Sequence, residues 1–133
     1  MMLLDTHVLV WFAEGHPSLG PRTTRLADAA LRRDEVLVAA VSFWEIAMLL
    51  AKARLHMELS PMAFRQKVLE QGVREIALTG AIGIAAAELP TLHDDPADRM
   101  IVATALSLDA TLATADRRIL GWGGRVRAHD ARR

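Results

Sequence analysis

The 133-residue chain contains no cysteine. That absence excludes disulfide frameworks, zinc sites built from thiolates, and cysteine nucleophiles. Long apolar runs are also missing, because the longest uncharged stretch covers residues 76–87, well short of the roughly 20 residues that a membrane-spanning helix needs. The N-terminus has no basic region and places Asp5 where a signal peptide would have its apolar stretch. We therefore expect a cytoplasmic protein without a membrane segment.

Neither sign of charge is in excess, because 16 basic residues balance 16 acidic ones. The distribution is uneven, since residues 117–133 contain six arginines and Asp130 as the single acid. An acidic body with an arginine-rich end differs from the overall basic balance of a domain that reads DNA grooves. Hydrophobic residues make up 52% of the chain, too many for a disordered protein. The length fits a single domain over residues 1–133.

Short apolar runs alternate along the chain with stretches of helical spacing. The runs expected to form strands cover residues 1–4, 36–41, 73–78 and 111–114, with a short edge strand at 125–127. The expected helices cover residues 21–31, 43–55, 62–69, 80–89 and 97–108. This alternation predicts an α/β fold in which helices cover both faces of a parallel sheet of about five strands.

Four carboxylates fall where predicted strands end or where the following helices begin: Asp5, Glu45, Asp98 and Asp116. In open parallel sheets, ligands bind beyond the carboxyl ends of the strands, so we expect these side chains to share one rim. Each acid also has a structural explanation. Asp5 fits a solvated strand end, Glu45 fits a capping box with Ser42, and Asp98 and Asp116 fit the first turns of helices.

Taken together, the four acids favour a metal site. Carboxylates on one rim would repel one another, and burial would raise their pKa values unless a cation neutralised them. Hard cations such as Mg²⁺ or Mn²⁺ take oxygen ligands, which this chain supplies without any thiolate that would favour zinc. A site of this kind suits hydrolysis of a phosphodiester by an activated water.

Four sequence blocks carry the resemblance to a known family: LLDTHVLVWF, VSFWEIAM, ELPTLHDDPADRMIVATAL and LATADRR. In this order and approximate spacing, the chain resembles PIN-domain ribonucleases, and among them the VapC-type toxins of bacterial toxin–antitoxin pairs. The resemblance implies a PIN-like three-layer α/β/α sandwich and an Mg²⁺- or Mn²⁺-dependent endoribonuclease. It also implies a small cognate antitoxin, a homodimer, and an RNA substrate, of which tRNA is the commoner sort.

The same resemblance assigns roles to residues. The family's acidic quartet, which would be catalytic and hold the metal, corresponds to Asp5, Glu45, Asp98 and Asp116. Residues that would orient these carboxylates or cap the helix that presents Asp98 are Thr6, Thr114 and Asp95. Candidates for RNA or antitoxin contacts are Arg99, Arg117 and Arg118, although for Arg99 we favour an ion pair with a neighbouring acid.

Two positions depart from the family pattern. Ala97 stands where a bulky aromatic is common, and Asp94 stands where a basic or polar residue is common. Neither position belongs to the quartet. His7 and His93 lack a partner at metal-ligand spacing, so we expect them to lie at the surface or form hydrogen bonds. The helix around Trp44 is apolar nearly all round, which indicates core packing with some surface left for a partner.

Two other functions remain open at this point. A Mg²⁺-dependent phosphatase could use a related open sheet, but Asp5-Thr6-His7 lacks the second acid that enzymes forming an aspartyl-phosphate often carry. A non-catalytic binding module of the PIN fold is the other alternative, and the loss of one quartet acid would have favoured it. Nothing in the sequence selects a particular RNA.

Overall fold

A five-stranded parallel sheet forms the centre of the computed structural model, which describes all of residues 1–133. The strands are β1 (Met2–Leu4), β2 (Val36–Ala39), β3 (Arg74–Ile76), β4 (Thr111–Thr114) and β5 (Arg127–Asp130). Their order across the sheet is β3-β2-β1-β4-β5, and every neighbouring pair is parallel. Parallel neighbours require long crossover connections, which the intervening helices supply. The predicted parallel sheet is confirmed.

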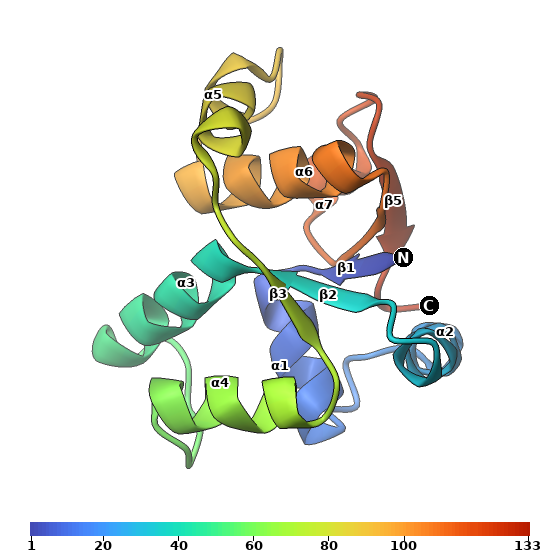
Figure 1. Ribbon diagram of the computed structural model, residues 1–133, viewed down its shortest axis with the longest axis vertical. Coiled ribbons are helices and arrows are strands. Elements are labelled where there is room, and N and C mark those ends of the chain that lie inside the picture. The colour runs from blue at the N-terminus through green and yellow to red at the C-terminus, as the bar shows by residue number, and fades with distance from the viewer.

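Seven helices cover the two faces of this sheet and complete the predicted α/β/α sandwich (Figure 1). They are α1 (Thr6–Glu14), α2 (Pro21–Arg32), α3 (Ala40–Ala51), α4 (Pro61–Glu70), α5 (Gly80–Glu88), α6 (Pro96–Leu108) and α7 (Arg117–Leu120). Figure 1 shows α5, α6 and α7 on one side of the sheet and α1, α2 and α4 on the other. None of these helices combines the length and the apolar character needed to cross a membrane.

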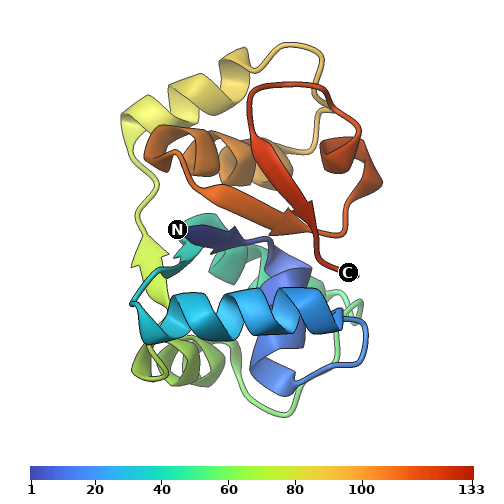
Figure 2. The same ribbon diagram turned by 90° about the vertical axis from the view of Figure 1, so that its right-hand side faces the viewer.

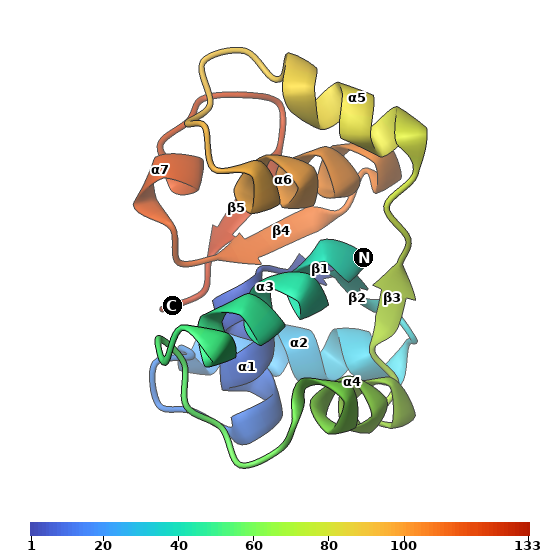
Figure 3. The ribbon, with the colours of Figure 1, turned by 90° about the vertical axis from the view of Figure 1, so that its left-hand side faces the viewer.

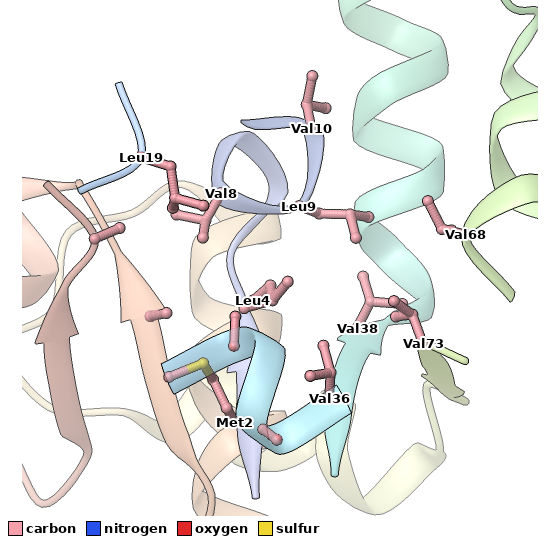
Figure 4. Packing of buried hydrophobic residues seen from close by; sticks show 14 of the residues in the cluster. Met2, Leu4, Val8, Leu9, Val10, Leu19, Val36, Val38, Val68 and Val73 are labelled. Carbon is pink, nitrogen blue, oxygen red and sulfur yellow. The ribbon is translucent and has the colours of Figure 1, made fainter. Parts of the chain in front are cut away.

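Alternation along the strands divides the core between the two faces, because successive side chains of a strand point to opposite sides. Met2 and Leu4 belong to the cluster beneath α1 and α4, whereas Leu3 belongs to the cluster beneath α6. The neighbouring strand repeats the pattern, with Val36 and Val38 on the first side (Figure 4). Both faces are buried, which explains why these strands read as continuous apolar runs rather than alternating ones.

The boundary between β2 and α3 lies earlier than the sequence predicts. The strand expected over 36–41 ends at Ala39, and α3 begins at Ala40. Ser42 therefore lies inside the helix, so the predicted capping box with Glu45 is wrong. The apolar run VLVAAV explains the error, because a buried strand and the start of a buried helix cannot be distinguished by periodicity. The last strand also lies later than predicted, beginning at Arg127.

The C-terminal residues pack against the first turn of α2 (Figure 2). Gly20 is the N-cap of this helix and forms no side-chain cap; instead, the backbone N–H and the hydroxyl of Thr23 donate to the carbonyl oxygen of Arg133, at 2.9 and 2.8 Å. Gly20 N–H donates to the carbonyl of Ala131 at 2.9 Å. A side chain at Gly20 would collide with the backbone of Arg132 and Arg133, so glycine permits this close approach.

Candidate metal centre

The four predicted acids line a single cavity of about 400 Å³ at the carboxyl ends of the strands. Asp5 directly follows β1, and Asp116 follows β4 after one residue. Glu45 comes from α3 and Asp98 from the first turn of α6. Figure 3 shows the start of α6, the end of β4, and α7 at the same end of the sheet. The remaining lining residues are His7, Trp11, Asp95, Ala115, Arg118 and Arg132.

Thr114 connects two of these acids. Its hydroxyl donates to Asp5 Oδ2 at 2.6 Å and accepts from the backbone N–H of Asp116 at 3.0 Å. Asp5 also caps α1, because its Oδ1 accepts from the Thr6 N–H at 2.9 Å. Burial raises the pKa of Asp5 against the opposing effect of these two hydrogen bonds. The buried Thr114 thus fixes the orientation of the Asp5 carboxylate.

Asp98 belongs to two groups of potential metal ligands. Its carboxylate, His93 and Asp116 offer ligand atoms that all lie within 4.8 Å of one another, and so do Asp98, Glu45 and Asp95. Asp95 caps α6 as expected, since its Oδ1 accepts from the Asp98 N–H at 2.9 Å. Its carboxylate is also close enough to serve as a ligand, which the sequence did not indicate. Oxygen donors dominate both groups, and such a set fits a hard divalent cation.

The charges in the cavity are incompletely balanced. Burial raises the pKa of Asp98 to about 7, opposed by the hydrogen bond from His93 and reinforced by neighbouring carboxylates. Burial likewise raises the pKa of Glu45. Burial raises the pKa of Asp116, but the hydrogen bonds and the positive charge of Arg118 lower it further, so that the pKa lies below its ordinary value. A divalent cation among these side chains would offset the repulsion that remains after Arg118 has paired with Asp116 and Asp98.

We expect the metal-free protein to lose stability as the pH rises through this range. The folded pKa of Asp98 lies above its ordinary value of 3.8, so between about pH 4 and pH 7 the folded state holds a proton that the unfolded state has released. Stability from this group is therefore present at low pH and is lost as the pH rises through about 7. Melting temperatures of wild type and Asp98→Asn, both in chelator, should diverge in favour of the variant from about pH 4 to pH 7. Parallel pH profiles would contradict this assignment.

His93 is a site residue whose contact the sequence did not specify. Its Nε2 lies 2.6 Å from Asp98 Oδ2, and its Nδ1 is buried without a hydrogen-bond partner. The expected hydrogen-bonding role is confirmed, with a quartet acid as the partner. The expectation that His93 lacks a partner at metal-ligand spacing is wrong, because His93, Asp98 and Asp116 bring their ligand atoms together. The only sequence signal is that His93 precedes the DDPADR segment, five residues before Asp98.

Arg99 does not form the ion pair that we favoured, and its guanidinium does not line the cavity. It donates instead to five backbone carbonyls, which belong to Ala86, Ala87, Leu89, Leu92 and His93. Two of these carbonyls belong to the last turn of α5 and three to the segment between α5 and α6, and a planar guanidinium with five N–H groups satisfies all of them at once. Arg99 is therefore a structural residue that fixes the segment carrying His93.

The other two predicted arginines differ from each other. Arg118 lines the cavity and contacts Asp116 through Nη2 at 3.0 Å and Asp98 at 3.5 Å. Arg117 is exposed and lies outside the cavity lining.

Replacing Thr114 by valine should lower divalent-metal affinity about 10- to 100-fold, because the Asp5 carboxylate and the Asp116 backbone both lose their shared partner. Thr114→Ser keeps the hydroxyl and should stay near wild type. Calorimetric titration with Mn²⁺ measures the affinity, and Thr111→Val in the same strand is the matched control. Equal affinities for Thr114→Val and Thr111→Val would show that Thr114 does not orient the site.

Comparison with known proteins agrees with this geometry. The sequence profile of the PIN domain matches residues 2–121. The chain belongs to the PIN domain family. It is 34% identical over 119 residues to a protein named Ribonuclease VapC22 from Mycobacterium tuberculosis (strain ATCC 25618 / H37Rv), a match that covers 89% of this chain and 88% of that protein. The resemblance to PIN domains and to VapC-type members is confirmed.

Solved structures of similar fold include two that contain DNA. The structure of FitAB bound to an IR36 DNA fragment has a TM-score of 0.69, with 20% identity, and covers 100% of this chain and 96% of the matched chain. VapBC2 from Rickettsia felis, bound to a DNA fragment from its promoter, has a TM-score of 0.69 and 15% identity, with 96% of each chain covered. At these identities, the likeness establishes the PIN fold.

Proposed function

We propose that this PIN domain is an Mg²⁺- or Mn²⁺-dependent endoribonuclease that acts as the toxin of a toxin–antitoxin pair. The observation that carries the proposal is the cavity in which four acids from distant parts of the chain meet, with Asp98 common to two ligand groups. The 34% identity to a protein named Ribonuclease VapC22 supports ribonuclease activity. The fold neighbours crystallised as VapBC and FitAB assemblies support an antitoxin partner.

Asp98 would hold the cation together with Asp116 or with Glu45 and Asp95, and Asp5 lines the same cavity. When bound, a divalent cation supplies neutralisation of the phosphate and activation of a water for in-line attack. Thr114 fixes the Asp5 carboxylate, and His93 fixes that of Asp98. The half-buried Glu45 has a raised pKa, which suits it to accept the proton that the attacking water gives up.

The partners in this proposal follow from charge and exposure. RNA brings a phosphate to the acidic cavity, and tRNA is the substrate we would test first. Apolar side chains on the neighbouring helices α3 and α4 are open to solvent, with Trp44 59% and Met62 72% exposed. This surface would serve a small cognate antitoxin or a second copy of the chain in a homodimer.

Cleavage of unfractionated tRNA by the purified, antitoxin-free chain tests the proposal. We expect cutting with Mg²⁺ or Mn²⁺ and no cutting in EDTA, because the acids alone cannot activate water or neutralise the phosphate. Mapping the ends should show 5′-phosphates and 3′-hydroxyls. Cleavage that persists in EDTA would contradict the metal mechanism. No cleavage by protein whose metal binding has been verified calorimetrically would favour a non-catalytic module.

A further inference from the structure

The two arginines that line the cavity differ in how their charge is balanced. Arg118 approaches two carboxylates, with its Nη2 3.0 Å from Asp116 and 3.5 Å from Asp98. Arg132 lines the same cavity, yet its guanidinium forms no ion pair with any carboxylate of the chain. The cavity therefore contains one arginine that takes part in no ion pair.

Neutral groups hold Arg132 in place. Its Nη1 donates to the carbonyl of Ala115 at 2.7 Å, and its guanidinium lies over the ring of Trp11, 5.9 Å from the centroid. Its backbone N–H donates to Asp130 Oδ1 at 3.0 Å. The tail on either side is fixed by its packing on the start of α2 (Figure 2). These contacts orient the guanidinium and leave most of its five N–H donors free.

We propose that Arg132 binds a phosphate of the RNA substrate at the edge of the acidic cavity, with Trp11 and the Ala115 carbonyl positioning its guanidinium. This inference rests on the proposed ribonuclease function. A polyanion that approaches five carboxylates needs a cation that is still available, and a guanidinium matches phosphate with paired donors. An acidic protein partner could use the same charge, but RNA is favoured because Arg132 shares the cavity with the acids assigned to its cleavage.

The binding experiment uses fluorescently labelled unfractionated tRNA and proteins that also carry Asp98→Asn, so that no cleavage interferes. Affinity is measured over a series of KCl concentrations for Arg132→Ala, Arg132→Lys and the matched control Arg133→Ala. Arg133 is exposed and lies outside the cavity lining. Loss of one phosphate contact should raise Kd roughly tenfold and reduce the slope of log K against log salt by about 0.7–0.9. Arg132→Lys should lose less RNA affinity than Arg132→Ala, and Arg133→Ala should have the same Kd and salt slope as its parent protein.

Kinetics on the otherwise unchanged enzyme provide the second readout. Arg132→Ala should raise KM about tenfold and leave kcat within about twofold, because a contact made equally in the ground and transition states affects KM alone. Melting temperatures equal to wild type would show that the variants fold. Trp11→Phe, which keeps an aromatic face, should retain more affinity than Trp11→Leu.

A salt slope for Arg132→Ala equal to that of Arg133→Ala would overturn the inference, and so would a fall in kcat with KM unchanged. The binding arm does not require cleavage, so the two proposals fail separately. If wild type cuts no RNA while Arg132→Ala still loses slope, the phosphate contact stands and the ribonuclease assignment falls. If wild type cuts RNA and Arg132→Ala behaves like its control, only the phosphate contact falls.

Discussion

Replacing Asp98 by asparagine should lower metal-dependent RNA cleavage at least about 100-fold. Metal ions contribute several kcal/mol to such reactions, and each 1.36 kcal/mol corresponds to a factor of ten in rate. Asp98 is the carboxylate common to both ligand groups, so its loss affects the site more than the loss of a peripheral acid. The measurement is cleavage of unfractionated tRNA with Mn²⁺, together with calorimetric titration of the metal.

The same variant should stay folded and melt a few degrees higher than wild type in chelator, because a buried and repelled charge has been removed. Asp28→Asn is the matched control, since Asp28 is an exposed acid of α2 outside the cavity. Its cleavage should equal that of wild type. An Asp98→Asn protein that unfolds would make this acid structural, and one that cleaves normally would remove it from the metal site.

Replacing Arg99 by alanine should lower the free energy of unfolding by about 3 kcal/mol, which corresponds to roughly 10 °C in Tm. Five backbone carbonyls lose their partner at once, and α5 and α6 lose one of their links while their apolar contact remains. Urea denaturation of the metal-free protein measures the effect. Arg25→Ala, an exposed arginine of α2 that forms no side-chain bond in the structure, should change stability little.

Arg99→Lys distinguishes geometry from charge. A lysine keeps the positive charge but offers one ammonium, which cannot reach five separated carbonyls. We therefore expect most of the destabilisation to remain, accompanied by weaker metal binding because His93 belongs to the same segment. Arg99→Lys as stable as wild type would show that charge alone is required.

The candidate site could be predicted only in part. Residues placed by local sequence patterns were predicted, whereas contacts between distant parts of the chain were not. Asp5 and Asp116 follow strands that are visible as short apolar runs, and the parallel arrangement brings such strand ends together. The helix that carries Asp98 begins with Asp95-Pro96, which is a local signal. The role of Thr114, two residues before Asp116, could also be predicted, because this residue lies beside an acid in the sequence.

Other contacts join parts of the chain that no local pattern relates. Ser42 fits a helix cap, yet it lies within α3 and accepts a hydrogen bond from the Thr6 hydroxyl at 3.0 Å. Arg99 follows an acid in sequence, which suggests an ion pair, but the chain between α5 and α6 surrounds it with carbonyls. Arg132 reaches the cavity only because the tail packs on the start of α2.

The sequence by itself determined the α/β architecture and the four acids, because apolar runs and helix starts depend on neighbouring residues. Only the tertiary structure decided that His93 contacts Asp98, that Arg99 holds the segment before α6, and that Arg118 is paired while Arg132 is not. Hydrogen bonds and ion pairs form between whichever groups the packed chain places within reach, and that proximity is set by the fold rather than by sequence spacing.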